Sequence, residues 1–320
     1  MRFAGLLEGS RLKERSPRFL LLGASGNVGV NILACAQRAE VFPVYWATPI
    51  RHPNALQVNL DDVQALEESI ERIKPDAIIH CAGMTKPRAC QLDPAASYRL
   101  NVQVTERVAE IASRRNCRLL FLSSDLVFGG GDNLLDEDRP VAPQCVYGEH
   151  KVLAEQAVRS RCGQNAVIVR ASLCYGWARE YPQPMLDWAV SQLTAGSALQ
   201  AFSDLSRTMC PLSSLAETIL ELLIAATPPP LVHVSGSELI ARDVFFRRMA
   251  CEFGFDPSLV QSVSFVDDVP GMHLPRTLHL ISHYRSELPP PSIESGLALV
   301  HRQSQDGYRR RVNDYFDISK

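Results

Sequence analysis

The sequence predicts an α/β fold in which a doubly wound parallel sheet carries a smaller C-terminal lobe. From residue 18 to residue 172, short apolar runs alternate with amphipathic stretches, which is the pattern of successive β-α units. Three glycines stand directly between the first apolar run and the first amphipathic stretch, where this fold has a tight turn. After about residue 176 the rhythm changes to separate helices and loops with two proline clusters. This change indicates a lobe packed on the sheet.

The individual elements follow from apolar periodicity. Buried strands are expected over 18–23, 41–47, 75–83, 117–124 and 165–172, with a shorter strand over 54–60. Helices are expected over 27–39, 61–73, 95–116 and 147–162. Pro43 lies near the start of its strand, where a missing N–H is tolerable. The helix over 61–73 begins with two acids, which favour a helix N-terminus.

Four segments follow from this organisation. They are an N-terminal extension (1–17), a nucleotide-binding domain (18–176), a lobe interleaved with strands of the sheet (177–302) and a solvated tail (303–320).

Composition excludes several classes of protein. The 320 residues are 46% hydrophobic and carry a net charge of −2, so no broad surface for nucleic acid or an anionic membrane is expected. Nine scattered cysteines without a Cys-x-x-Cys pair predict neither a zinc site nor a disulfide framework, and they favour a reducing compartment. The N-terminus has no signal-peptide core and no apolar run is long enough to span a bilayer. We therefore expect a cytoplasmic protein without metal, nucleic-acid or membrane partners.

The first chemical motif is the stretch LLLGASGNVG, which places Gly23, Gly26 and Gly29 between a strand and a helix. Glycines there allow a tight turn, close approach of backbone N–H groups to a pyrophosphate, and close packing of helix on strand. The loop residues Ser25, Asn27 and Val28 are expected to contact the cofactor with them. A glycine-rich turn without a ligand is the alternative.

The loop after the second strand reads ATPIRHP and has no carboxylate for a ribose diol. Thr48, Arg51 and His52 could instead receive a 2′-phosphate, which favours NADPH over NADH; NADH stays the alternative. Arg51 could equally be a solvated loop arginine.

The second motif consists of a serine at a strand end and a Tyr-x-x-x-Lys pair on a helix: Ser124, Tyr147 and Lys151. Reduction of a ketone leaves an alkoxide that needs a proton, and a tyrosine can deliver it as a general acid. A lysine one helical turn away lies on the same face and lowers the tyrosine pKa by its charge. The chain has only five lysines, which makes a chance pairing less frequent. Ser123 competes with Ser124 for the serine position.

These motifs resemble a known family. The glycine spacing is similar to that of the extended short-chain dehydrogenases/reductases, which have a Rossmann-type fold. The stretches SSDLVFGG, EDRPVAPQCVYGEHKVLAEQAV and VIVRASLCYG resemble the dTDP-4-dehydrorhamnose reductase family. Looser matches, HCAGMT, LVHVSG and SIESGLALV, extend the resemblance from about residue 18 to residue 302. Leu126 departs from the family, which has tyrosine at that position.

The resemblance implies a catalytic triad of Ser124, Tyr147 and Lys151, with Tyr147 and Lys151 also contacting the cofactor. It implies further cofactor contacts at Leu60, Asp61, Ala82 and Gly83, although Asp61 could instead cap the helix that follows. It implies substrate contacts at Thr85, Asp125, Val127, Phe128 and Arg207, with a structural salt bridge as the alternative for Arg207.

The implied activity is NADPH-dependent reduction of a keto group on a nucleotide-linked sugar similar to dTDP-4-dehydrorhamnose. The alternatives are an NADP-binding regulatory subunit resembling the methionine adenosyltransferase β subunit, and a nucleotide-sugar epimerase or dehydratase. Whether the chain forms a homodimer is left open.

Overall fold

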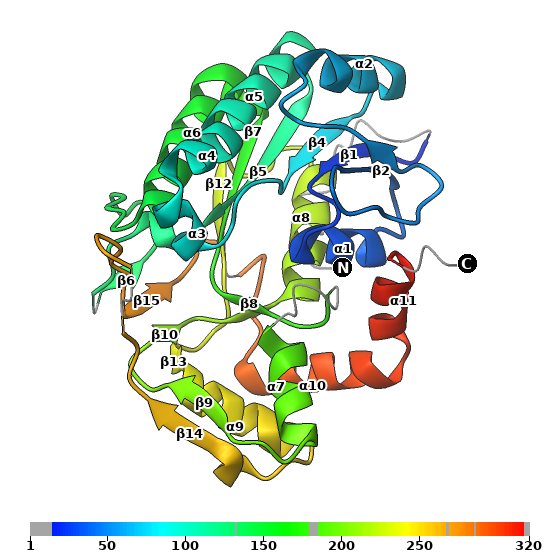
Figure 1. Cartoon of the computed structure of the whole chain (residues 1–320). Coiled ribbons are helices and arrows are strands. Elements are labelled where there is room, and N and C mark those ends of the chain that lie inside the picture. The colour runs from blue at the N-terminus through cyan, green and yellow to red at the C-terminus, as the bar shows by residue number, and fades with distance from the viewer. Residues whose placement is uncertain (1–14, 132, 179–184, 267–268, 285, 317–320) are drawn as a thin grey trace.

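The computed structural model describes residues 15–131, 133–178, 185–266, 269–284 and 286–316. A seven-stranded sheet lies at the centre of these residues, with all strands parallel and in the order β12-β7-β5-β4-β1-β2-β3 (Figure 1). The chain runs outward from β1 to β3, then returns to the other side of β1 with β4. The doubly wound fold predicted from the sequence is confirmed. The strands are β1 (Arg18–Leu22), β2 (Glu40–Tyr45), β3 (Leu56–Gln57), β4 (Ala77–His80), β5 (Arg118–Ser124), β7 (Ala166–Ala171) and β12 (Leu231–Val234).

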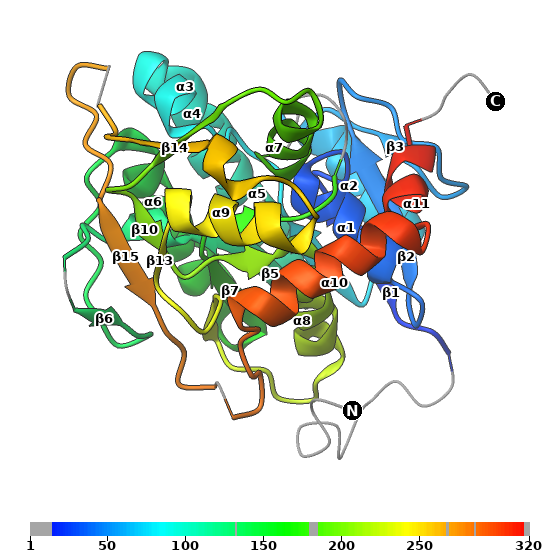
Figure 2. The same ribbon diagram turned by 90° about the horizontal axis from the view of Figure 1, so that it is seen from below.

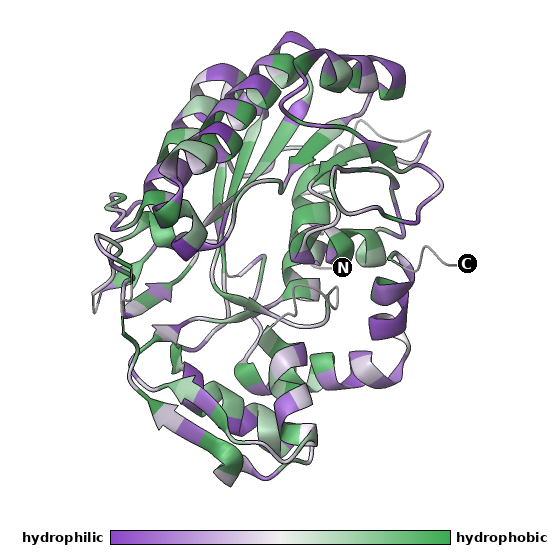
Figure 3. Ribbon diagram, viewed as in Figure 1, coloured by the Kyte–Doolittle hydropathy of each residue, from purple (hydrophilic) through white to green (hydrophobic). Residues whose placement is uncertain are grey.

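Helices cover both faces of the sheet (Figure 1). One face carries α2 (Val63–Ile73), α5 (Val104–Arg114) and α6 (Val146–Cys162), and the other carries α1 (Asn27–Cys35) and α8 (Leu212–Ile224). Alternate strand residues face opposite sides: Leu20 packs with α5 and α6, and Leu21 packs with α1 and α8. Both sets are fully buried, which explains the near-continuous apolar strands and the polar outer faces of the helices in Figure 3.

The single helix predicted over 95–116 is three elements in the structure. After α3 (Pro87–Leu92), the chain forms α4 (Pro94–Tyr98), a π-helical turn η1 (Arg99–Gln103) and α5. The wider turn directs Asn101 at the loop after β4, where its Oδ1 accepts from the Met84 N–H (2.9 Å) and its Nδ2 donates to Met84 O (3.0 Å). The helical pattern predicted the helix but not this bulge, which tertiary hydrogen bonds hold in place.

A smaller lobe lies at the carboxyl edge of the sheet (Figures 1 and 2). Its core is apolar, with Trp177 and Phe245 fully buried. A four-stranded sheet in the order β13-β10-β15-β6 joins residues 134–135 to this lobe. The elements here are β6 (Leu134–Leu135), β8 (Cys174–Tyr175), α7 (Met185–Thr194), β9 (Leu199–Phe202), β10 (Ser206–Arg207), β11 (Cys210–Pro211), β13 (Ile240–Ala241), α9 (Arg242–Glu252), β14 (Val260–Val263), β15 (Thr277–Leu280) and α10 (Ile293–Gln305). Short 3-10 turns are η2 (Asp125–Val127), η3 (Gly163–Asn165) and η4 (Pro257–Leu259).

Lobe and sheet alternate along the chain, because α8 and β12 return to the central sheet after β11. The predicted boundary at residue 176 stays a prediction. No helix in the described part of the chain is long and apolar enough to cross a membrane.

The expectation of a solvated tail from residue 303 is wrong for part of that segment. Helix α10 continues to Gln305, and α11 (Tyr308–Asp314) packs against α1. Tyr308 and Val312 are buried four residues apart on one helical face, and the Tyr308 hydroxyl donates to Asn31 Oδ1 (2.8 Å). Residues 1–14 of the predicted extension and residues 317–320 lie outside the described residues.

Candidate active site

A cleft of ≈ 840 Å³ follows the carboxyl edge of the central sheet and is closed on its far side by the smaller lobe. Parallel strands of a doubly wound sheet direct their carboxyl ends at such a cleft, where the strand order reverses. Of the residues predicted from the sequence, the following line it: Gly23, Ser25, Gly26, Asn27, Val28, Gly29, Thr48, Leu60, Ala82, Gly83, Thr85, Ser124, Asp125, Tyr147 and Arg207. The structure thus brings most of the predicted residues to one place.

The glycine loop forms one end of the cleft. Gly23 has φ +83°, and a Cβ there would lie 2.6 Å from the backbone N of Ala82. A Cβ on Gly29 would lie 2.5 Å from the carbonyl oxygen of Gly23. Gly26 precedes the first turn of α1, so the unpaired N–H groups of that helix face the cleft. The loop therefore needs glycine for steric reasons, and its backbone donors suit the pyrophosphate of a dinucleotide.

The wall beyond β2 is aromatic. Trp46 directly follows that strand, lines the cleft and keeps 54% of its surface exposed. Trp46 was not predicted as a site residue, because Tyr45 and Trp46 continue the apolar pattern of the expected strand over 41–47. Thr48 also lines the cleft, whereas Arg51 is exposed outside it and its backbone N–H donates to Tyr315 O (2.6 Å).

Asp61 does not line the cleft. Its Oδ2 lies 3.6 Å from Arg99 Nε, so it forms a surface contact with the π-helical turn. The alternative role as helix cap is wrong, because Asp62 caps α2 by accepting from the Ala65 N–H (3.0 Å), while the expected cofactor contact of Asp61 stays a prediction.

Ser124 and Tyr147 meet at the floor of the cleft. Ser124 ends β5 and Tyr147 lies in the first turn of α6, and both line the cleft, where the Ser124 hydroxyl is close enough to act on the pKa of Tyr147. Ser124 Oγ also donates to Asp125 Oδ1 (3.1 Å) and accepts from the Leu126 N–H (3.2 Å). Burial first, and the Asp125 charge second, raise the pKa of Tyr147 well above that of a free tyrosine. The phenol is therefore protonated at neutral pH.

Lys151 is buried one turn beyond Tyr147. Its Nζ donates to Leu122 O (2.8 Å) and lies 4.6 Å from the centroid of the Phe121 ring and 5.8 Å from that of the Tyr147 ring. Burial lowers the pKa of Lys151 to about 8. The pKa of Tyr147 is raised and not lowered as expected: burial and Asp125 are the main causes, and Lys151 is not among the groups that act on it.

Ser123, the competing serine, has a different partner. Its Oγ donates to the buried Glu155 Oε1 at 2.6 Å. Its hydroxyl therefore contributes to the packing of α6 on β5, and Ser124 is the serine beside Tyr147.

Two arginines of the smaller lobe line the far wall of the cleft. Arg207 Nε lies 3.5 Å from Asp125 Oδ2, and its remaining nitrogens donate to the carbonyl groups of Ser206, Pro275 and Arg276. The salt bridge considered for Arg207 thus exists. Arg242, which the sequence analysis missed, has a buried Nε without a hydrogen-bond partner among the described residues. Burial, and then the charge of Arg207, lower the pKa of Arg242 to about 10. Two guanidinium groups against one carboxylate leave this wall with a net positive charge.

Val127 and Phe128 do not reach the cleft. Both are buried with Leu135, Leu278 and Leu280 in a separate apolar cluster, and Phe128 packs edge-on against His233. The 3-10 turn η2 after Ser124 breaks the strand alternation and turns these two side chains into the core. The predicted substrate contacts at these positions are not supported.

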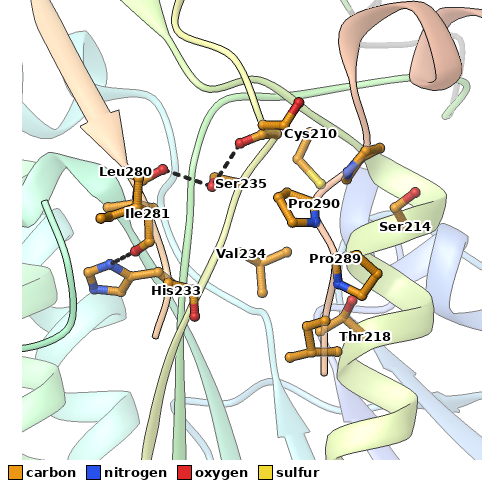
Figure 4. A pocket seen from close by; sticks show the side chains of 15 residues that line it. Cys210, Ser214, Thr218, His233, Val234, Ser235, Leu280, Ile281, Pro289 and Pro290 are labelled. Carbon is orange, nitrogen blue, oxygen red and sulfur yellow. Dashed lines mark hydrogen bonds between the residues drawn. The ribbon is translucent and has the colours of Figure 1, made fainter. Parts of the chain in front are cut away.

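Figure 4 shows a second cavity, of ≈ 80 Å³, near the end of β12. Thr218, Pro289 and Pro290 line it together with Ser235, whose hydroxyl donates to Leu280 O (2.9 Å). This volume holds a few water molecules and is far too small for a nucleotide. Within the described residues, no group of three or more His, Cys, Asp or Glu side chains could hold a metal ion.

Comparisons with known proteins agree with this geometry. The model of the RmlD substrate binding domain family matches residues 17–277. Among curated relatives, the probable low-salt glycan biosynthesis reductase Agl14 of Haloferax volcanii is 27% identical over 294 residues, covering 89% of this chain and 96% of the relative. The dTDP-4-dehydrorhamnose reductase of Mycobacterium tuberculosis is 28% identical over 259 residues, covering 78% and 80%.

Two further likenesses are less complete or more distant. Methionine adenosyltransferase 2 subunit beta of Rattus norvegicus is 30% identical over 161 residues, and the match spans 50% of this chain and 48% of that protein. The structure of dTDP-4-dehydrorhamnose reductase from Bacillus anthracis in complex with NADP has a TM-score of 0.78 at 19% identity, covering 90% of this chain and 99% of that one. The family match spans most of the chain and includes the glycine loop, the strand end and the helix that form the cleft. The chain belongs to the RmlD substrate binding domain family.

Proposed function

We propose that this chain is an NADPH-dependent reductase that converts a keto group of a nucleotide-linked sugar to an alcohol, with dTDP-4-dehydrorhamnose as the first candidate substrate. One observation carries the proposal. A protonated phenol, Tyr147, and the Ser124 hydroxyl lie side by side in a cleft that has a glycine loop at one end and two arginines at the other. Similarity to two curated reductases over most of the chain supports it.

The nicotinamide cofactor, when bound, supplies the hydride. The chain itself holds the pyrophosphate with backbone N–H groups after Gly26, and Trp46 offers a flat apolar surface at the adenine end. The lining residues described near Trp46 and Thr48 include no carboxylate that would repel a 2′-phosphate. This supports NADPH over NADH.

Ser124 and Tyr147 act on the carbonyl oxygen. The Ser124 hydroxyl orients that oxygen, and Tyr147 donates its phenolic proton as negative charge develops there. Lys151 is charged below pH about 8 and would hold the cofactor ribose beside Tyr147. Its side chain is not among those that line the cleft, but its Nζ donates to the carbonyl oxygen of Leu122, a residue that does line it.

The positive wall of Arg207 and Arg242 suits the diphosphate of a nucleotide sugar. Asp125 neutralises one of the two guanidinium groups, and Arg242 keeps unused donor capacity. A buried guanidinium nitrogen without a hydrogen-bond partner is costly unless a ligand supplies one. An uncharged ketone would leave this wall unpaired.

Two other activities compete with reduction. A dehydratase needs an acid/base pair beyond the tyrosine, and Asp125, which is ion-paired with Arg207, is the one carboxylate among the described residues that line the cleft. That observation favours reduction over dehydration. A regulatory subunit, the alternative that the methionine adenosyltransferase likeness raises, needs no turnover at all.

The decisive experiment measures NADPH oxidation at 340 nm with a panel of dTDP- and UDP-linked 4-keto sugars. We expect turnover with at least one of them. Tyr147→Phe should abolish turnover and leave the Kd for NADPH, measured by fluorescence, within about two-fold, because the phenol contributes mainly to the proton transfer. Arg242→Gln should raise KM for the sugar at least about ten-fold without changing NADPH binding. Tight NADPH binding without turnover on the whole panel, together with a co-purifying partner protein, would favour the regulatory subunit.

A further inference from the structure

A buried charged network lies beneath the cleft, centred on Glu155 and Arg170. Glu155 lies one turn after Lys151 on α6 and is 3% exposed. Its two oxygens accept from Arg170 Nε (2.9 Å) and Nη2 (2.7 Å) in a forked ion pair. Arg170 lies on β7 and is also 3% exposed. Neither side chain is among those that line the cleft.

The network reaches the anchor of Lys151 through one strand. Lys151 Nζ donates to Leu122 O, and the next residue, Ser123, donates its hydroxyl to Glu155 Oε1 at 2.6 Å. The carboxylate therefore fixes both the strand that accepts from the ammonium and the helix that carries it. Arg170 Nη1 extends the network to His233 Nε2 on β12 (3.4 Å).

We propose, on the basis of the proposed function, that Glu155 and Arg170 form a positioning pair that sets the location and the charge of the Lys151 ammonium. A buried carboxylate near an ammonium favours the charged form, and a guanidinium on the far side of that carboxylate weakens its effect. The two members of the pair therefore act on Lys151 in opposite directions.

Other ionisable groups also surround Lys151. They are His80 at the end of β4, Cys81 directly after it, Cys90 on α3 and Tyr147 on α6 itself. Burial holds the pKa of His80 at about 3 and that of Cys81 at about 12, and it raises the pKa of Cys90 and of Tyr147. These four groups are therefore neutral near pH 8.

The test titrates the Lys151 ammonium directly in the unligated full-length protein. The chain has five lysines, so selective 13C labelling of lysine gives few signals, and Lys151→Arg identifies the relevant one. Glu155→Gln keeps hydrogen-bonding capacity but removes the charge, and should lower the pKa of Lys151 by roughly one unit. Arg170→Gln should raise it, and the double variant should lie between the two.

Two controls separate charge from folding. Arg159 also contacts Glu155 (3.6 Å) but its side chain is 51% exposed, so Arg159→Gln should leave the pKa of Lys151 within about 0.2 unit. Arg170→Lys keeps the charge while losing the fork, and should restore the wild-type pKa even where Arg170→Gln folds poorly. NADPH binding should weaken as Lys151 loses its charge, so the Kd for NADPH should rise with increasing pH. This rise should begin at a lower pH in Glu155→Gln than in the wild type.

Shifts of Glu155→Gln and Arg170→Gln in the same direction, or no shift in Glu155→Gln, would overturn the proposal. This result is independent of turnover. Failure of the proposed function would give a different result. Lys151→Ala protein would then bind NADPH like the wild type, while the pKa of Lys151 would still change in the Glu155→Gln and Arg170→Gln variants.

Discussion

The two adjacent serines at the end of β5 allow a matched test of the site. Both lose the same single hydroxyl on substitution by alanine, but their partners differ. Ser123 donates to a buried carboxylate, whereas Ser124 lies beside Tyr147 and Asp125. The proposed function therefore predicts two separable effects, one on stability and one on rate.

Ser123→Ala should cost stability. A hydrogen bond to a charged group contributes about 1.5–3 kcal/mol, and because Glu155 keeps both contacts with Arg170 we expect the lower value. Turnover should fall by no more than a few-fold. Ser124→Ala removes a part-buried hydroxyl at the cleft, and should reduce the free energy of unfolding by about 1 kcal/mol or less. Its rate should fall roughly 10²- to 10³-fold, the usual loss for one donor to a developing oxyanion.

Urea unfolding gives the first quantity, and NADPH oxidation with the best keto sugar gives the second. The reasoning is refuted if Ser123→Ala loses the large factor in rate while Ser124→Ala retains activity. Equal losses in both variants would also contradict it, because the structure assigns the two hydroxyls to different partners.

Three further predictions concern the rest of the molecule. Gly29→Ala should weaken NADPH binding at least about ten-fold, because the new Cβ would lie 2.5–2.7 Å from backbone atoms that cannot move aside. Gly26→Ala should weaken binding less, because the nearest atom to its Cβ is 3.3 Å away. A fluorescence titration with NADPH measures both. Tyr308→Phe should lower the free energy of unfolding in urea by about 1–3 kcal/mol, since it leaves the buried Asn31 Oδ1 without that donor; an unchanged midpoint would mean that α11 does not stabilise the fold. Burial raises the pKa of the Cys81 and Cys210 thiols from 9.0 to about 12, so these thiols ionise at lower pH in the unfolded chain than in the folded one. Their contribution to stability should be fully present below pH 9 and should fall as the pH rises toward 12. Urea unfolding at pH 8, 9 and 10 would measure this fall.

Over residues 18–172 the sequence was sufficient for the order of the central strands and most of the helices, because buried parallel strands and amphipathic helices have distinct periods. It also located the cleft, since the carboxyl ends of β1, β4 and β5 lie along one edge of the sheet. The glycine loop was predicted from its place between a strand and a helix, and Ser124, Tyr147 and Lys151 from their order along the chain and the resemblance to a known family. What remained out of reach depends on contacts between distant segments.

Four residues show why. The resemblance to a known family implied substrate contacts at Val127 and Phe128, but a 3-10 turn directs both side chains into the core. Arg242 begins a helix whose distance from the cleft depends on how the lobe packs, so no local pattern distinguishes it from a surface arginine. The pKa of Tyr147 depends on its burial by segments that are remote in sequence, so its shift could not be predicted from the spacing of Tyr147 and Lys151.

The raised pKa of Tyr147 also bears on the direction of the proposed reaction. Oxidation of an alcohol would need the phenolate as a base, and burial together with Asp125 makes that form rare at neutral pH. Reduction needs the phenol as an acid, and the alkoxide that accepts its proton is far more basic than a phenolate, so transfer remains favourable. Burial raises the pKa of Asp125, and Arg207 opposes that rise and so favours the ionised carboxylate next to the phenol. The same buried charges that hold the smaller lobe against β5 thus maintain Tyr147 in its proton-donating form.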